Sequence, residues 1–382
     1  MLECQKDKFS LPENVSYLNC AYFSPLLKQV EKIGYKAISQ KKLPYQIKID
    51  HFFEPVAELK QLFARLIDVD NYEQIALIPG VSYGISNVAK NIQLSAGENI
   101  VVVEEQFPSN VYPWLKKAHD TGAQIKTIQP TNMPSKRGKT WNDNMLDAID
   151  SKTKVVALPH VHWADGTLFD LKAIRNQCDK YGSYLIIDGS QSVGALPFSV
   201  QDIRPDALIC AGYKWLMGPY SLGLAYYNEK FDHGDPIEEC WINKLESEDF
   251  QNLANYQEVY KPHAARYNVS ESSNFILVPM LAAAIKQILA WTPKAIQEYC
   301  QMISSDAIHE LIEHGCQIEE KTYRSNHLFG IRLSTDFDLE SIKKSMAENN
   351  VYVSFRGNAI RVAPHVYNRQ IDFAKLVQCI KQ

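Results

Sequence analysis

The chain has 382 residues, of which 46% are hydrophobic and 22% charged, and its formal net charge is −4. This length is enough for two domains, and the composition is that of an ordinary globular protein. The small negative charge gives no reason to expect nucleic acid or an anionic membrane as a partner. Two short basic clusters, 41–42 and 136–139, are interpreted as solvated ends of loops or helices.

The eight cysteines are scattered, and no pair has Cys-x-x-Cys spacing or lies in a cluster with histidines. This arrangement argues against a zinc site and indicates free thiols in a reducing compartment. Residues 1–8 contain no apolar leader, and no apolar run reaches the length of a membrane span. We therefore expect a cytoplasmic protein with no metal, membrane or nucleic acid as a partner.

Apolar strands alternate with helical patterns through the first two thirds of the chain. Ser24 and Pro25 are expected at the N-cap and first position of a helix, and Ser82 and Asp170 are expected to cap two more. A fourth helix is predicted at 108–119. The predicted strands are 75–78, 99–103, 124–129, 154–158, 184–188, 206–210 and 222–227. This alternation predicts an α/β fold whose mostly parallel sheet is covered on both faces.

The pattern changes near residue 230, where a polar and irregular segment is followed by a long helix at 275–291. The last 60 residues predict strands and helices of a smaller α+β unit. We expect a large domain at 31–255, a small C-terminal domain at 256–382, and a segment at 1–30 that associates with the small domain.

The most informative residue is Lys214. A short apolar run ends at Asp188, and the next apolar stretch is followed by Gly212, Tyr213 and Lys214. If both runs are strands of one parallel sheet, their carboxyl ends face one crevice, where ligands of open α/β folds bind. A lysine and a carboxylate in one crevice suit pyridoxal 5′-phosphate (PLP), because the amine forms a Schiff base with the aldehyde and the acid keeps the pyridine nitrogen protonated.

These segments resemble the class V aminotransferase family of fold-type I PLP enzymes, which includes cysteine desulfurases, kynureninase and isopenicillin N epimerase. The resembling segments run in family order and are 80–84, 105–114, 160–166, 188–194, 212–219 and 356–368. The resemblance implies a fold-type I large domain that binds PLP between these segments.

The resemblance also implies cofactor contacts, and four of the residues, Ser82, Phe107, Gln191 and Asp188, have a plainer alternative. Val81 and Ser82 would bind the phosphate at a helix N-terminus, although Ser82 also reads as a simple N-cap. Phe107 would stack on the pyridine ring, although a Phe-Pro pair at a helix start also serves in a core. Gln191 would lie near the phenolic oxygen of PLP or in an exposed loop, and Tyr213 would contact the phosphate. Asp188 has a helix N-cap as its alternative.

We expect residues of the last predicted strands to bind the substrate. Arg361 resembles the family arginine that binds the substrate carboxylate, and Arg356 is a competing or second anchor. In this family a phosphate contact arrives from the second subunit, within a segment resembling 270–274, so we expect Ser273 to take part and the protein to be a homodimer with shared active sites. Trp163 replaces an asparagine of desulfurases, which leaves its role open.

The last predicted strands lack a cysteine, and this limits the reactions that the protein is expected to catalyse. Cysteine desulfurases need a mobile cysteine near the arginine segment, and 352–361 contains none. We therefore expect an aminotransferase or epimerase-like enzyme that acts at the α-carbon of an amino acid. Desulfurase or other lyase activity, kynureninase-type C–X cleavage and a non-catalytic PLP-binding protein stay as alternatives, the last disfavoured because Lys214 and Asp188 are both present.

Overall fold

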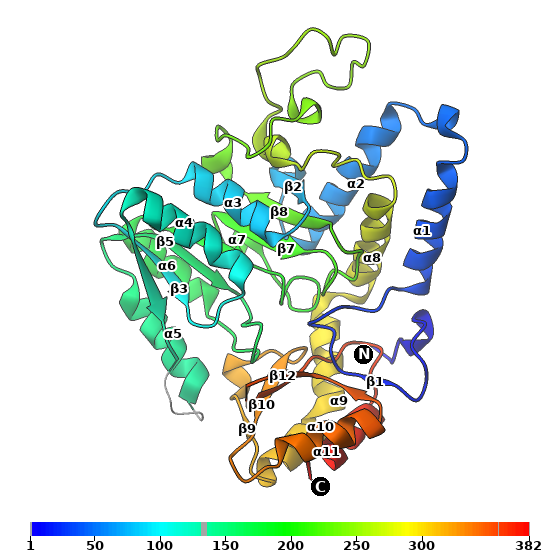
Figure 1. Cartoon of the computed structure of the whole chain (residues 1–382), viewed down its shortest axis with the longest axis vertical. Coiled ribbons are helices and arrows are strands. Elements are labelled where there is room, and N and C mark those ends of the chain that lie inside the picture. The colour runs from blue at the N-terminus through cyan, green and yellow to red at the C-terminus, as the bar shows by residue number, and fades with distance from the viewer. Residues whose placement is uncertain (1, 131–135, 358, 382) are drawn as a thin grey trace.

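The computed structural model describes residues 2–130, 136–357 and 359–381, and its centre is a seven-stranded sheet (Figure 1). The sheet order is β2-β8-β7-β6-β5-β3-β4. Its strands are β2 (Ile75–Ile78), β3 (Asn99–Val103), β4 (Gln124–Ile128), β5 (Thr153–Pro159), β6 (Tyr184–Asp188), β7 (Ala207–Ala211) and β8 (Gly223–Tyr227). β8 pairs antiparallel with β2 and β7, and the other pairs are parallel. The predicted α/β class with a mostly parallel sheet is confirmed.

Helices cover both faces of this sheet, because alternate residues of each strand point to opposite sides. In β6, Leu185 and Ile187 join one buried cluster and Ile186 joins the other. One face is covered by α3 (Val81–Asn91) and α4 (Tyr112–Thr121). The other is covered by α2 (Asp50–Ile67), α5 (Arg137–Ala148), α6 (Leu171–Tyr181), α7 (Val200–Ile203) and α8 (Leu277–Trp291).

Two predicted helix starts are wrong. The first helix, α1 (Lys28–Gln40), begins after Leu27, and the hydroxyl of Ser24 donates instead to the carbonyl of Tyr213 over 3.1 Å. Helix α3 begins one residue before Ser82, so Gly80 is its N-cap. Asp170 does cap α6, because its carboxylate accepts from the N–H of Ala173.

The C-terminal unit is built on a four-stranded antiparallel sheet in the order β12-β13-β10-β9. Its strands are β9 (Gln317–Ile318), β10 (Phe329–Arg332), β12 (Ser354–Arg356) and β13 (Ala359–Val362), and its helices are α9 (Pro293–Glu313), α10 (Leu339–Glu348) and α11 (Gln370–Ile380). The chain's first residues lie against this unit, since β1 (Ser16–Tyr17) pairs with β11 (Val351–Tyr352) and the N–H of Gln5 donates to Val366.

Helix α8 follows residue 256, where the boundary between the two domains was predicted. Helix α8 packs between α1 and α2 beside the large sheet, and α9 leads from it into the C-terminal unit (Figure 1). Pro293 opens α9, and the side chain of Thr292 caps it. We therefore propose a domain boundary near residue 292.

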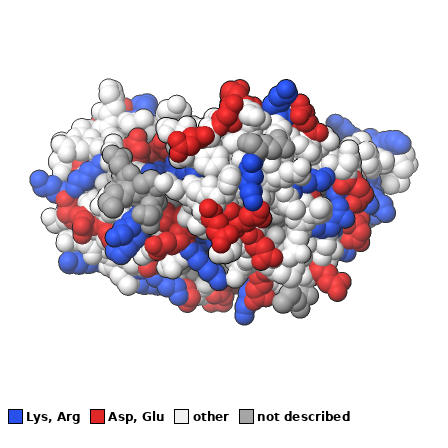
Figure 2. Space-filling view, turned by 90° about the horizontal axis from the view of Figure 1, so that it is seen from below, with Lys and Arg blue, Asp and Glu red and all other residues white. Residues whose placement is uncertain are grey.

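The underside of the molecule carries interspersed basic and acidic side chains (Figure 2). None of the helices in the described ranges combines the length and the apolar character that a membrane crossing requires.

Candidate active site

Asp188 and Lys214 meet in one cavity of about 450 Å³ at the carboxyl ends of the central strands. Asp188 is the last residue of β6, and Lys214 follows the end of β7. These strands are parallel neighbours with Asp188 opposite Ile209, so both side chains leave the sheet at the same edge. The sequence-based placement of this pair in a single crevice agrees with the structure.

The loop that carries Lys214 is closed tightly against the sheet. The N–H of Gly212 donates to the carbonyl of Leu222, and the N–H of Gly218 donates back to Gly212 over 2.8 Å. A Cβ on Gly212 would lie 2.2 Å from the oxygen of Leu222, so a side chain there would force the loop away. Glycine is therefore needed to hold the lysine at this position.

The amine of Lys214 is buried at 7% exposure. Its Nζ lies 5.0 Å from the ring centre of Phe107, and no hydrogen-bond partner for it occurs among the described residues. Burial lowers the pKa of Lys214 to about 8, with the charge of Asp188 opposing this shift and that of Arg361 adding to it. A large share of this amine is therefore neutral near pH 8.

The carboxylate of Asp188 is also buried. Its Oδ1 accepts from the backbone N–H of Ser190 over 2.9 Å, and no described residue donates to its Oδ2. Burial raises the pKa of Asp188, while Ser190 and the charge of Lys214 act in the opposite direction. A cation placed against the free oxygen would stabilise the charged carboxylate.

The N-terminus of α3 opens onto the same cavity. Gly80, Val81 and Ser82 all line it. The N–H groups of Val81 and Ser82 belong to the first turn and have no acceptor within the helix. A Cβ on Gly80 would meet nothing within 4 Å, so there is room beside these donors. Free N–H groups at a helix N-terminus form a site for a phosphate.

Three more predicted residues line the cavity. Phe107 and Tyr213 both lie near Lys214, whose Nζ is 5.0 Å from the ring centre of Phe107 and 5.6 Å from that of Tyr213. Burial raises the pKa of Tyr213 to about 12. Gln191 is buried, with its amide held by two contacts: it accepts from the indole of Trp215 over 2.8 Å and donates to the carbonyl of Ala21.

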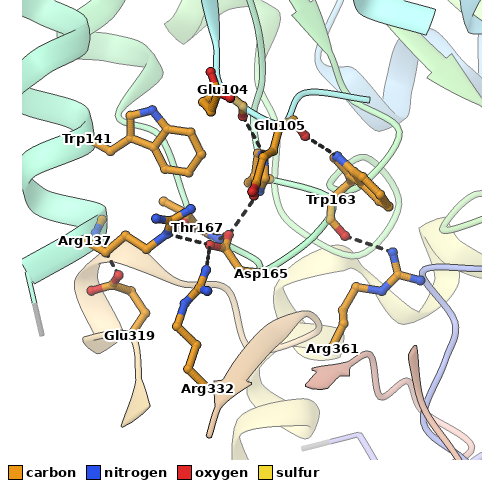
Figure 3. A network of polar contacts seen from close by, with 12 residues as sticks. Glu104, Glu105, Arg137, Trp141, Trp163, Asp165, Thr167, Glu319, Arg332 and Arg361 are labelled. Carbon is orange, nitrogen blue, oxygen red and sulfur yellow. Dashed lines mark hydrogen bonds and ion pairs between the residues drawn. The ribbon is translucent and has the colours of Figure 1, made fainter. Parts of the chain in front are cut away.

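Trp163, whose role was left open, joins the cavity to the C-terminal unit (Figure 3). Its indole N–H donates to the carbonyl of Glu105 over 2.6 Å, and its ring meets that of Phe107 edge-on with centres 5.6 Å apart. Its own carbonyl accepts from Nη1 of Arg361 over 2.9 Å. The turn that follows β5 therefore forms one wall of the cavity and also holds Arg361 through the carbonyl of Trp163.

The three remaining predicted residues do not line this cavity. Arg361 is 1% exposed, and its Nη2 donates to Ser354 and Asn19. Arg356 lies with its guanidinium 5.1 Å from the ring centre of Trp163. Ser273 is buried beside a separate cavity between α1, α2 and the start of α8, so a contact from Ser273 to the cofactor site requires another subunit.

Some cavity residues were missed by the sequence analysis. Tyr220 and Ser221 follow the Gly218-Pro219 turn and close one side of the cavity, and Ser190 follows Asp188. These residues could have been predicted, because they lie within or directly after the segments 188–194 and 212–219. No comparable signal pointed to Asn19, which reaches Arg361 from the far end of the chain.

The family profile described as Aminotransferase class-V matches residues 48–368. The uncharacterized aminotransferase YcbU of Bacillus subtilis is 25% identical over 80% of this chain and 78% of its own length. Among solved structures, the cysteine desulfurase CsdA of Escherichia coli has a TM-score of 0.82 at 17% identity, covering 98% of this chain and 96% of that chain. The cystine C–S lyase C-DES has a TM-score of 0.86 at 17% identity, covering 97% and 98%.

The family profile spans most of the chain, so the protein belongs to the class V aminotransferase family. The structural likeness confirms the predicted fold-type I architecture. Membership of this family assigns pyridoxal 5′-phosphate as the cofactor. The cavity fits that group, because it offers free N–H donors at α3, a carboxylate with an open oxygen and a buried amine.

Proposed function

We propose that this protein is a PLP-dependent enzyme that acts at the α-carbon of a free amino acid, by transamination or epimerisation. The observation that carries the proposal is the buried amine of Lys214, with its pKa lowered to about 8, in one cavity with Asp188. When bound, PLP supplies an aldehyde for a lysine amine and a ring that stabilises negative charge at the α-carbon.

Different residues of the cavity would contact different parts of this cofactor. Val81 and Ser82 would bind its phosphate through backbone N–H groups, and Tyr213 would stand beside it. Asp188 would pair through Oδ2 with the protonated ring nitrogen, and Phe107 would cover one ring face. Gln191 would stand near the phenolic oxygen, already oriented by Trp215 and Ala21.

Lys214 and Arg361 would act on the substrate. A lysine amine whose pKa lies near 8 can accept a proton at neutral to mildly alkaline pH and return it, which suits a general base and acid. Arg361 would bind the α-carboxylate, since its planar guanidinium matches two carboxylate oxygens. The hydrogen bond to Trp163 holds Arg361 toward the cavity wall.

Sulfur extraction is the alternative reaction, and desulfurases are among the similar proteins. It requires an accessible thiolate. Seven of the eight cysteines are buried, and Cys4 is partly buried near the N-terminus. Burial raises the pKa of Cys20 to about 12 and that of Cys316 to about 11, which keeps both as thiols. This favours chemistry at the α-carbon.

We also propose a homodimer in which Ser273 of one subunit completes the phosphate site of the other. Support comes from the position of Ser273, which lies outside the cofactor cavity of its own chain. Complementation tests this. A mixture of Lys214→Ala chains and inactive Ser273 variants should regain activity, because mixed dimers contain one intact site. Mixing without any gain would contradict a shared site.

The reaction itself is tested by α-proton exchange. Amino acids are incubated with the protein in heavy water, and loss of the α-proton signal is followed by NMR with and without a keto acid. Exchange that depends on Lys214 supports the proposal, and transfer of the amino group to the keto acid identifies a transaminase. Sulfide release from cysteine without exchange would favour the desulfurase alternative.

A further inference from the structure

Two arginines project from the same face of one β-hairpin. In the β12–β13 pair, Ser354 stands opposite Arg361 and Arg356 opposite Ala359. Side chains alternate along a strand, so Arg356 lies on the same face as Ser354 and hence as Arg361. The two arginines are diagonal neighbours across the hairpin.

Both arginines contact the same residue of the large domain. Arg361 donates to the carbonyl of Trp163, and the guanidinium of Arg356 lies 5.1 Å from the centre of the Trp163 ring. The ring lines the cofactor cavity and is fixed by its bond to the carbonyl of Glu105. The hairpin therefore brings two positive charges to one side of the cavity wall.

Neither charge is compensated by a carboxylate among the described residues. The donors of Arg361 go to neutral oxygens of Trp163, Ser354 and Asn19, and its Nε has no partner. Nε of Arg356 also has none. Asp165 lies two residues after Trp163 in the same turn, and its arginine neighbours are compensated. Its Oδ2 is 2.9 Å from Nε of Arg137 and 2.6 Å from Nη2 of Arg332 (Figure 3).

Arg361 is buried and Arg356 is half-buried, and uncompensated charges of the same sign are unfavourable where water is largely excluded. Burial lowers the pKa of Arg361 to about 10, and the charge of Arg356 adds to this shift. A ligand with one negative group satisfies only one of the two guanidiniums. A ligand with two negative groups, separated by a short carbon chain, satisfies both.

We propose that the substrate is an amino acid with a second anionic group on its side chain, bound with its α-carboxylate at Arg361 and its side-chain acid at Arg356. This inference rests on the proposed function. The Trp163 ring would provide a flat apolar wall for the methylene groups between the two acids, and a guanidinium lying on an indole keeps its in-plane donors available.

The test compares acids with their own amides, which match them in size. Purified protein carrying its cofactor is titrated with L-aspartate, L-asparagine, L-glutamate, L-glutamine and L-alanine. Cofactor absorbance gives the dissociation constant, and α-proton exchange gives turnover. We expect at least one acid to bind about ten- to a hundredfold more tightly than its amide, as for a charge-assisted contact.

Variants of the two arginines test whether the preference for acids over amides depends on Arg356. Arg356→Gln should bring the ratio of acid to amide close to one and change the dissociation constant of alanine far less than that of the acid, while Arg356→Lys should keep part of the preference. Arg361→Gln should weaken all five amino acids. Arg65→Gln, at an exposed position in the last turn of α2, is the control and should change nothing.

Equal binding of acids and amides by the wild type would overturn this inference alone. So would an Arg356→Gln variant that loses alanine as strongly as aspartate, because Arg356 would then hold the α-carboxylate. A wild type that responds to none of the five amino acids would contradict the proposed function as well.

Discussion

Nη1 of Arg361 donates a hydrogen bond to the main-chain carbonyl of Trp163 across 2.9 Å. This contact joins a strand of the C-terminal unit to the turn that forms one wall of the cavity. Arg361 also lies close enough to Lys214 for its charge to lower the pKa of that amine. Arg361 and the amine of Lys214 are therefore electrostatically coupled.

The pKa of Lys214 should move in opposite directions in two variants. In the cofactor-free wild type, amine labelling of Lys214 followed by mass spectrometry should titrate near pH 8. Asp188→Asn removes a charge that stabilises the ammonium, so the midpoint should fall. Arg361→Gln removes a charge that destabilises it, so the midpoint should rise. Shifts of the same sign in both variants would mean that the coupling is wrong.

Asp188→Asn should retain PLP but lose α-proton exchange by about a hundredfold or more, because a neutral amide no longer favours a protonated ring nitrogen. Cofactor content is measured by absorbance after release in alkali, and exchange by NMR. Full exchange in this variant would reject the role of Asp188.

Arg361→Lys should raise KM for the amino acid about ten- to a hundredfold while PLP stays bound. The charge is kept, but the paired geometry toward a carboxylate is lost. Amino acid amides should react poorly with the wild type for the same reason. An unchanged KM in the variant would move the α-carboxylate anchor elsewhere.

Asp165→Ala should destabilise the protein by about 3–5 kcal/mol, the usual cost of removing one partner of a buried ion pair. Asp165 is 5% exposed and lies between Arg137, Arg332 and His162. Denaturant unfolding measures the change. Asp143→Ala, which removes only an exposed i,i+4 pair with Lys139, is the control and should cost less than about 1 kcal/mol.

The network around Asp165 also predicts a dependence on pH. Burial alone would raise the pKa of Asp165, but His162, Arg137 and Arg332 hold it well below its usual value. The stabilisation from a lowered carboxyl pKa is present above the unfolded-state value near 4 and is lost as the pH falls below it. Unfolding free energies of wild type and Asp165→Asn should therefore converge in acid, and a constant difference down to strongly acidic pH would contradict this.

Local features of the sequence were sufficient to place Asp188 and Lys214. Each stands at or just after the end of a short apolar run. The parallel pairing of β6 with β7 then brings both residues to the same edge of the sheet. Long-range contacts could not be predicted in the same way. Ser24 looked like a helix cap, but the carbonyl of Tyr213 competes for its hydroxyl. Asn19 meets Arg361 only because the chain's first residues fold against the C-terminal unit.

Helices α2 and α9 are among those that the sequence did not predict, and each has a physical reason. Helix α2 contains Pro55, which argues against a helix when only local preference is considered. Helix α9 buries Gln297 and Ser304 along with its apolar residues, so its hydrophobic period is interrupted. The amide of Gln297 donates to the carbonyl of Ala195 and also lies 2.8 Å from Nδ1 of His327, partners that no local pattern indicates.

Borohydride reduction of the purified protein can show whether Lys214 is the amine that holds the cofactor. Reduction fixes the cofactor to the amine that holds it, and digestion followed by mass spectrometry locates the modified lysine. We predict loss of the visible absorbance and a single modified peptide containing Lys214, with neither change in Lys214→Ala. A modified lysine elsewhere, or a Lys214→Ala protein that keeps the borohydride-sensitive absorbance, would contradict it.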